Sequence, residues 1–180
     1  MAKANDRLHQ FDAQLKATVA SLLEEQGFTR SGRTRLWTRP SETAQGVCQL
    51  VWIQVGESAS TLGGRFTVEF GIYYPKYDRF ANGRDLIGPF IGACHFDVRT
   101  RLGLLMEPAE DRWWKYNGTE EQLAKQMVET ARLVAELGLP WLAATDTAAN
   151  LATYNTGKVP EPDRLRREAF LKHQAKQKSK

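Results

Sequence analysis

The sequence has little of what metal sites and disulfide scaffolds require. Only two cysteines and three histidines occur among 180 residues, and none of them has the close spacing of a structural zinc site. Cys48 and Cys94 each lie in an apolar run, so we interpret both as small core residues rather than as a redox pair. We therefore expect no metal ion and no cofactor.

Long apolar runs are also missing. The longest stretch without a charged residue, 43–56, covers 14 residues, whereas a membrane helix needs about 20 mostly apolar ones. The segment Met1–Arg7 lacks the apolar stretch of a signal peptide. These absences favour a cytoplasmic protein that makes no contact with a membrane.

The charge is unevenly distributed along the chain. The formal net charge is +4, but residues 158–180 hold eight basic and three acidic side chains, which leaves 17 basic and 18 acidic ones for the rest. A chain of 180 residues suits one domain with an appendage. We predict a single domain over 1–157 and a basic tail over 158–180.

The hydrophobic periodicity changes twice along the chain. Apolar residues recur every three or four positions before Gly27, which is placed to end a helix in the left-handed conformation. Alternation with a period of two follows over four segments, near 33–38, 47–55, 66–74 and 93–105. The short links between them favour an antiparallel meander.

A helical pattern returns after a tryptophan-rich link. Thr119 and Gln122 have the spacing of a capping box at the start of a helix, and Gly138-Leu139-Pro140 is expected to end it. A further short helix is expected over about 141–154. The prediction is an α+β fold: an N-terminal helix, a four-stranded, mainly antiparallel sheet, C-terminal helices packed on the sheet, and the basic tail.

Several short segments, in their order, resemble a known family. They are Phe11 with Leu15, Gly27–Phe28 with Arg30, Leu36–Arg39, Gln54–Val55, Phe66–Ile72, Val98–Arg99 with Arg101–Leu102, Trp113–Trp114 and Leu139–Leu142. Together they are similar to the bacterial family of domains of unknown function numbered 4304, over about residues 7–155. The resemblance implies an α+β cytosolic domain and no established activity, cofactor or catalytic residue. Small proteins of this kind often sit among immunity and defence genes, which is an association only.

One polar cluster could support chemistry. Alternation places Glu69 on one strand face and His95, Asp97 and Arg99 on one face of another strand. If both faces share a side of the sheet, Glu69, His95 and Asp97 could act in a metal-dependent hydrolase or nuclease. The alternative is a cross-strand ion pair of Arg99 with Glu69 or Asp97. No nucleophile elbow or phosphate-binding loop occurs, so binding is favoured over catalysis.

The favoured hypothesis is a non-enzymatic protein-binding module, because tryptophan, tyrosine and arginine dominate interface hot spots. In the tryptophan-rich link, one ring is expected in the core and the other half-exposed. The candidate partner-binding residues are Trp52, Glu69, Tyr73, Asp97, Arg99, Arg112, Trp113 and Trp114.

The basic tail has two interpretations. It could dock on an acidic protein, or it could neutralise phosphates of a nucleic acid, although only one aromatic residue, Phe170, is available for base stacking. The tail residues that would make either contact are Arg164, Arg166, Arg167, Lys172 and Lys176.

Overall fold

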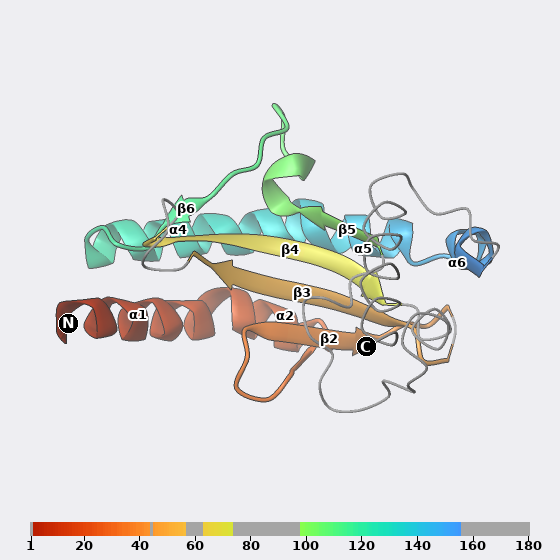
Figure 1. Ribbon diagram of the computed structural model, residues 1–180, viewed down its shortest axis with the longest axis horizontal. Coiled ribbons are helices and arrows are strands. Elements are labelled where there is room, and N and C mark those ends of the chain that lie inside the picture. The colour runs from red at the N-terminus through yellow and green to blue at the C-terminus, as the bar shows by residue number, and fades with distance from the viewer. Residues whose placement is uncertain (1, 44, 57–62, 74–97, 156–180) are drawn as a thin grey trace, which may run out of the picture.

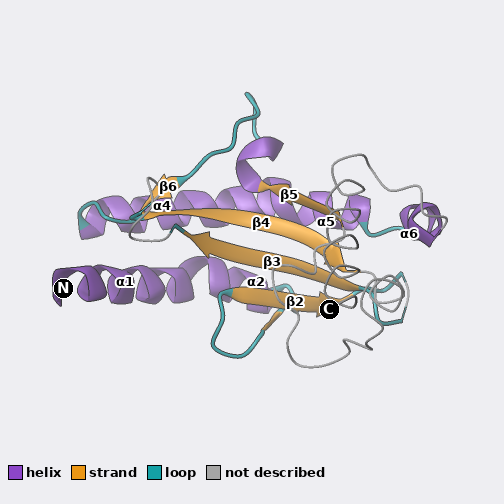
Figure 2. Ribbon diagram, viewed as in Figure 1, coloured by secondary structure: helices purple, strands orange, loops and turns teal. Residues whose placement is uncertain are grey.

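The computed structural model describes residues 2–43, 45–56, 63–73 and 98–155, and these form an antiparallel sheet with helices packed on one face (Figure 1). The two long helices, α1 (Ala2–Leu15) and α4 (Glu120–Leu133), both run along the direction of the strands (Figure 2). The predicted α+β fold is confirmed.

The N-terminal helical stretch is continuous but not uniform. A π-helical turn over Lys16–Ala20 joins α1 to α2 (Ser21–Glu25). The stretch ends at Gly27, whose φ of 80° is the left-handed conformation expected from the sequence. The amide of Phe28 donates to the Leu23 carbonyl at 2.9 Å, which satisfies one of the carbonyls that a helix end leaves open.

The sheet is a meander with two additions. Its strands are β1 (Thr29–Arg30), β2 (Leu36–Pro40), β3 (Cys48–Val55), β4 (Arg65–Tyr73), β5 (Val98–Arg101) and β6 (Trp114–Lys115). Strands β1 to β5 lie side by side in sequence order, and β6 pairs with the start of β4. All pairs are antiparallel, as predicted. The two-residue strands β1 and β6 raise the strand number above the predicted four.

The fourth predicted strand is shorter at its end than expected. It was predicted to reach Leu105, but β5 ends at Arg101 and Leu102–Leu105 forms a 3-10 turn. The reason is a close approach of the backbone: the Glu110 amide donates to the Gly103 carbonyl at 3.0 Å. A Cβ atom on Gly103 would lie 2.4 Å from the Glu110 carbonyl oxygen, so the turn requires glycine.

The predicted stop at Gly138-Leu139-Pro140 is wrong. A π-helical turn over Val134–Gly138 follows α4 directly, and α5 (Leu139–Thr145) continues from it. Gly138 keeps right-handed helical angles, with φ −70° and ψ −49°. Pro140 is the second residue of α5, and because it has no N–H it donates no backbone hydrogen bond to the preceding π-helical turn. After a short link, α6 (Ala148–Asn155) completes the described chain.

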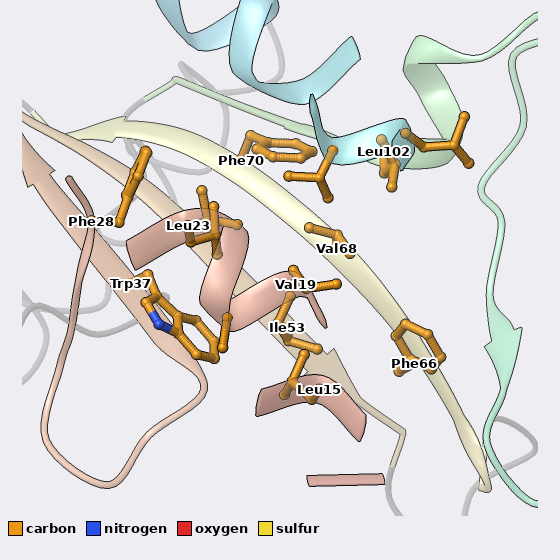
Figure 3. Close-up of a cluster of buried hydrophobic side chains, with 14 of the residues drawn as sticks. Leu15, Val19, Leu23, Phe28, Trp37, Ile53, Phe66, Val68, Phe70 and Leu102 are labelled. Atoms are coloured by element: carbon orange, nitrogen blue, oxygen red, sulfur yellow. The ribbon is translucent and has the colours of Figure 1, made fainter. Parts of the chain in front are cut away.

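The main core lies between the helices and one face of the sheet, which we call the helix face. Phe66, Val68, Phe70 and Ile72 of β4 are fully buried there. Figure 3 shows Phe66, Val68 and Phe70 beside residues of the N-terminal helical stretch, namely Leu15, Val19 and Leu23. Burying a side chain of this size stabilises the fold by about 1.5–3 kcal/mol.

The opposite side of the sheet, which we call the second face, carries a smaller cluster. Leu36, Leu50 and Tyr73 are buried on it, and Cys48 and Trp52 pack against them. Because successive side chains of a strand alternate, each residue of β3 and β4 belongs to one face only. The second face holds three of the polar residues that the sequence singles out, Glu69, Tyr73 and Arg99.

Candidate functional site

Strand register brings several predicted site residues together on the second face. Trp52 lies directly opposite Glu69, Cys48 opposite Tyr73, and Gly71 opposite Arg99. Trp52, Glu69, Tyr73 and Arg99 therefore share one side of the sheet, as the alternation indicates. Two other candidates, His95 and Asp97, lie outside the described residues, and so do the tail residues Arg164, Arg166, Arg167, Lys172 and Lys176.

Glu69 is a buried carboxylate with a cationic neighbour. Glu69 is only 3% exposed, and its Oε1 atom lies 3.1 Å from a guanidinium nitrogen of Arg99 on β5. The Arg99 side chain is 28% exposed, so the Glu69 end of the ion pair is buried and the Arg99 end is in contact with water. The geometry is that of the cross-strand pair, one of the two arrangements considered from the sequence.

Arg101 is the residue that sequence reasoning missed. It lies opposite Glu69 in the β4–β5 register, its Nη1 atom is 2.7 Å from a carboxylate oxygen of Asp111, and its Nη2 atom is 3.5 Å from Oε1 of Gln54. Its guanidinium carbon lies 5.5 Å from the centroid of the Trp113 ring. The signal was available, because Arg101 has the same strand parity as Arg99.

The three residues Arg112, Trp113 and Trp114 do not form one surface. Trp114 is 4% exposed and stacks on Phe66 of the helix face, with ring centroids 5.9 Å apart. Arg112 lies over the Trp114 ring, and one of its nitrogens is 3.9 Å from a carboxylate oxygen of Glu129 on α4. Only Trp113, which is half-buried, joins Arg101 on the second face.

Trp113 and Trp114 lie on opposite faces because successive side chains alternate in the extended segment that contains β6. One ring is in the core and the other half-exposed, as expected, but the partner-binding set predicted from the sequence is divided by the sheet. Trp114 cannot contact a partner without leaving the core. Tyr73 faces the second side, yet it is only 2% exposed.

A second polar cluster ties the C-terminal helices to the sheet. The Asp146 carboxylate accepts hydrogen bonds from Ser41 Oγ and Gln49 Nε2, both at 2.7 Å, and Asp146 is 8% exposed. Arg39 donates to Oε1 of the same Gln49 at 2.6 Å. No sequence pattern predicts this cluster, whose members are up to 105 residues apart. Since the groups are mutually hydrogen-bonded, we assign it a structural role.

Cys48 lies next to this cluster and is half-buried rather than fully in the core. Burial raises the pKa of its thiol, and the negative charge of Asp146 raises it further. The thiolate is the nucleophilic and metal-binding form, so both effects make this cysteine less reactive. Cys94 lies outside the described residues.

Within the described parts of the chain, no three histidine, cysteine, aspartate or glutamate side chains are grouped as a metal ion would need. No helix in those parts is both long and apolar enough to span a bilayer.

The fold and site define an α+β domain, a meander whose one face is covered by helices and whose other face carries ion-paired and aromatic side chains. The chain belongs to the family described as Domain of unknown function (DUF4304), whose model matches residues 19–144. Comparison with curated proteins found no match, and comparison with solved structures found none either.

Proposed function

We propose that this chain is a non-enzymatic, cytoplasmic protein-binding module, of the immunity or defence accessory type, and that its partner docks on the second face. The observation that supports this most directly is the Arg101–Trp113 stack on that face. Arginine and tryptophan are the residues that most often dominate binding energy in protein interfaces.

The stack is pre-organised for binding. Arg101 is fixed by Asp111, Gln54 and the Trp113 ring, and its side chain is still 29% exposed. A side chain that is already ordered in the free protein loses less conformational entropy on association, which favours affinity. The half-exposed Trp113 ring offers apolar area beside a fixed charge.

The alternatives from the sequence have less support. A hydrolase or nuclease would use Glu69 with His95 and Asp97, but the Glu69 carboxylate is already engaged by Arg99. A nucleic-acid role through the tail would depend on residues outside the described parts. Both stay predictions, and the experiment below distinguishes them from protein binding.

The test is a tagged capture from nuclease-treated cells of the native host, with full-length protein. The partner is then purified and its Kd measured for the wild type, Trp113→Ala and Arg101→Ala. We expect each substitution to weaken binding at least tenfold, as truncated hot-spot residues do. Arg132→Ala is the control, because Arg132 is 57% exposed on α4, a helix packed on the other side of the sheet.

Unchanged thermal midpoints must accompany the loss, so that a folding defect is not mistaken for a binding defect. Capture of no stoichiometric protein, or a partner whose Kd is the same for all variants, would refute the proposal. A partner that is captured in a parallel experiment without nuclease, but not after nuclease treatment, would point instead to nucleic acid.

A further inference from the structure

Two cations face each other at one end of the second face. In the β4–β6 register Arg65 lies directly opposite Lys115. Arg65 has the strand parity of Glu69, so both cations project on the second face, the same side as Trp113. Like charges directly opposite each other on neighbouring strands destabilise a sheet, and the pairing of these two residues contributes no attraction that offsets their repulsion.

No carboxylate compensates this pair in the described part of the chain. Neither Arg65 nor Lys115 forms an ion pair there, and two other acids, Glu69 and Asp111, are paired with Arg99 and Arg101. Lys115 is exposed and Arg65 is half-exposed, so both ammonium and guanidinium groups are accessible to an incoming group.

Other groups around the pair suit an anion. The Asn117 side chain packs against Gly64, with its Nδ2 atom 2.6 Å from the position that a Cβ of Gly64 would occupy. The Tyr116 amide donates to the Gly64 carbonyl at 2.8 Å, which holds this corner together. The Asn117 side-chain amide therefore lies against Gly64, the residue before Arg65, and Asn117 itself is two residues after Lys115.

We propose that Arg65, Lys115 and Asn117, beside Trp113, bind carboxylates of an acidic segment of a protein partner. The inference rests on the proposed docking function and adds the chemistry of the partner. An arginine and a lysine in water-accessible positions would each make a charge-assisted hydrogen bond to a carboxylate. Binding would thereby relieve the repulsion that the free protein carries.

A protein carboxylate fits this place better than a phosphate backbone. Outside the tail, the chain holds 17 basic and 18 acidic residues, so the body carries no net positive charge to attract a phosphate backbone. Arg65 and Lys115 are two cations, a number that suits a short acidic segment rather than the many phosphate contacts of a nucleic-acid backbone.

The first test uses stability and binding together, on the full-length chain. Lys115→Glu turns the like-charge pair into an opposite-charge pair, so we expect the thermal midpoint to rise by about 1–4 °C. The same variant should bind the captured partner at least tenfold more weakly. Arg65→Glu should reproduce both effects, because it makes the same change from the other strand.

The double variant Arg65→Glu/Lys115→Glu separates the two properties. It restores a like-charge pair, so its midpoint should return to near the wild-type value while partner binding stays lost. Lys125→Glu, on an exposed position of α4, changes net charge equally and should leave Kd within about twofold. A midpoint that falls in both single variants would overturn the proposal.

The second test identifies the ligand chemistry with two defined probes, a labelled deca-glutamate peptide and a ten-nucleotide oligothymidylate, measured by fluorescence anisotropy at low salt. We expect deca-glutamate binding to weaken at least threefold in Lys115→Glu relative to Lys125→Glu. Equal binding by the two variants overturns the proposal. A larger effect on the oligothymidylate, shared by Trp113→Ala, also overturns it in favour of nucleic acid.

The outcomes also distinguish this inference from the proposed function. A partner that is lost in Trp113→Ala but retained in Lys115→Glu leaves the docking function standing and overturns the acidic chemistry. If no partner is captured at all, the docking function fails, and the inference about the partner fails with it.

Discussion

At the scale of single residues, Gly138 shows how packing can decide what a sequence pattern means. A Cβ atom on Gly138 would lie 2.1 Å from Cζ of Phe70 and 2.4 Å from its Cε1. The helix approaches β4 so closely that no side chain fits between them. The glycine therefore serves close packing of a helix on a strand, and it does not end the helix.

Gly138→Ala should accordingly destabilise the protein by about 1–3 kcal/mol, the range for overpacking a filled core. At an open helical position the same change would stabilise the helix by about 1 kcal/mol, so the sign of the effect is diagnostic. Urea unfolding of both proteins measures it. A double-mutant cycle with Phe70→Leu should recover part of the loss, since the smaller side chain makes room; a stabilising Gly138→Ala would contradict the packing argument.

Cys48 gives a prediction on pH. Burial, and secondarily the Asp146 charge, raises the pKa of the thiol above its ordinary range. Iodoacetamide should therefore alkylate Cys48 more slowly than a free cysteine at pH 8, with the rate still rising at higher pH. Asp146→Asn removes the charge, which lowers the pKa, so the rate at pH 8 should increase.

Peptide mass spectrometry of the Cys48 fragment measures that rate separately from any reaction at Cys94. Alkylation of Cys48 at the speed of a free cysteine would contradict the prediction. The thermal midpoint of each variant is recorded as well, because Asp146→Asn also affects stability. The new amide N–H faces a hydrogen-bond donor, Ser41 or Gln49, and the loss of that hydrogen bond destabilises the fold by about 1–3 kcal/mol.

At the scale of elements, the pairing of β4 with β5 is reinforced by the Glu69–Arg99 ion pair. Arg99→Ala would leave the buried carboxylate without this cation, so we expect a loss of about 1–3 kcal/mol, below the full cost of a dry ion pair because Arg99 is 28% exposed. Combining it with Glu69→Gln should cost less than the two single losses added together. Chemical denaturation of the four proteins gives the coupling energy, and additive losses would mean that the pair does not stabilise the sheet.

Element boundaries were predictable where a local signal sets them. The Thr119–Gln122 capping box is present, with the Gln122 amide donating to the Thr119 hydroxyl at 3.2 Å, and Gly27 ends the first helix as expected. Element boundaries that depend on contacts with residues distant in the sequence were not predictable. The end of β5 depends on Glu110 approaching Gly103, and the continuation of the helix through Gly138 depends on Phe70.

At the scale of the whole molecule, the charge asymmetry separates a near-neutral body from a basic tail. A version ending at Gly157 should keep the thermal midpoint of the full chain within a few degrees, because the main buried cluster lies wholly within residues 11–142. Its net charge should fall from +4 to −1, which reverses its behaviour on cation exchange at pH 7. Circular dichroism and ion-exchange elution test both; a drop of ten degrees or more would mean that the tail belongs to the domain.

For the candidate site, the sequence predicts which residues share a face of the sheet, but not which side chains contact one another. Strand alternation alone places Glu69 and Tyr73 on one side, and it separates Trp113 from Trp114 once the link is known to be a strand. It does not say that Tyr73 is buried, or that Arg101 rather than Arg112 joins Trp113. Those facts depend on what packs against each side chain.

The α+β class, the order of the main helices and strands, and the alternation of side chains within each predicted strand follow from the sequence alone, because periodicity and local capping depend on neighbouring residues. Three pairings required the folded chain: Arg65 opposite Lys115, Arg99 with Glu69, and Asp146 with Ser41, 105 residues away in the sequence. These pairings depend on strand register and on contacts between distant segments, and a shift of one residue in register would exchange the two faces of a strand.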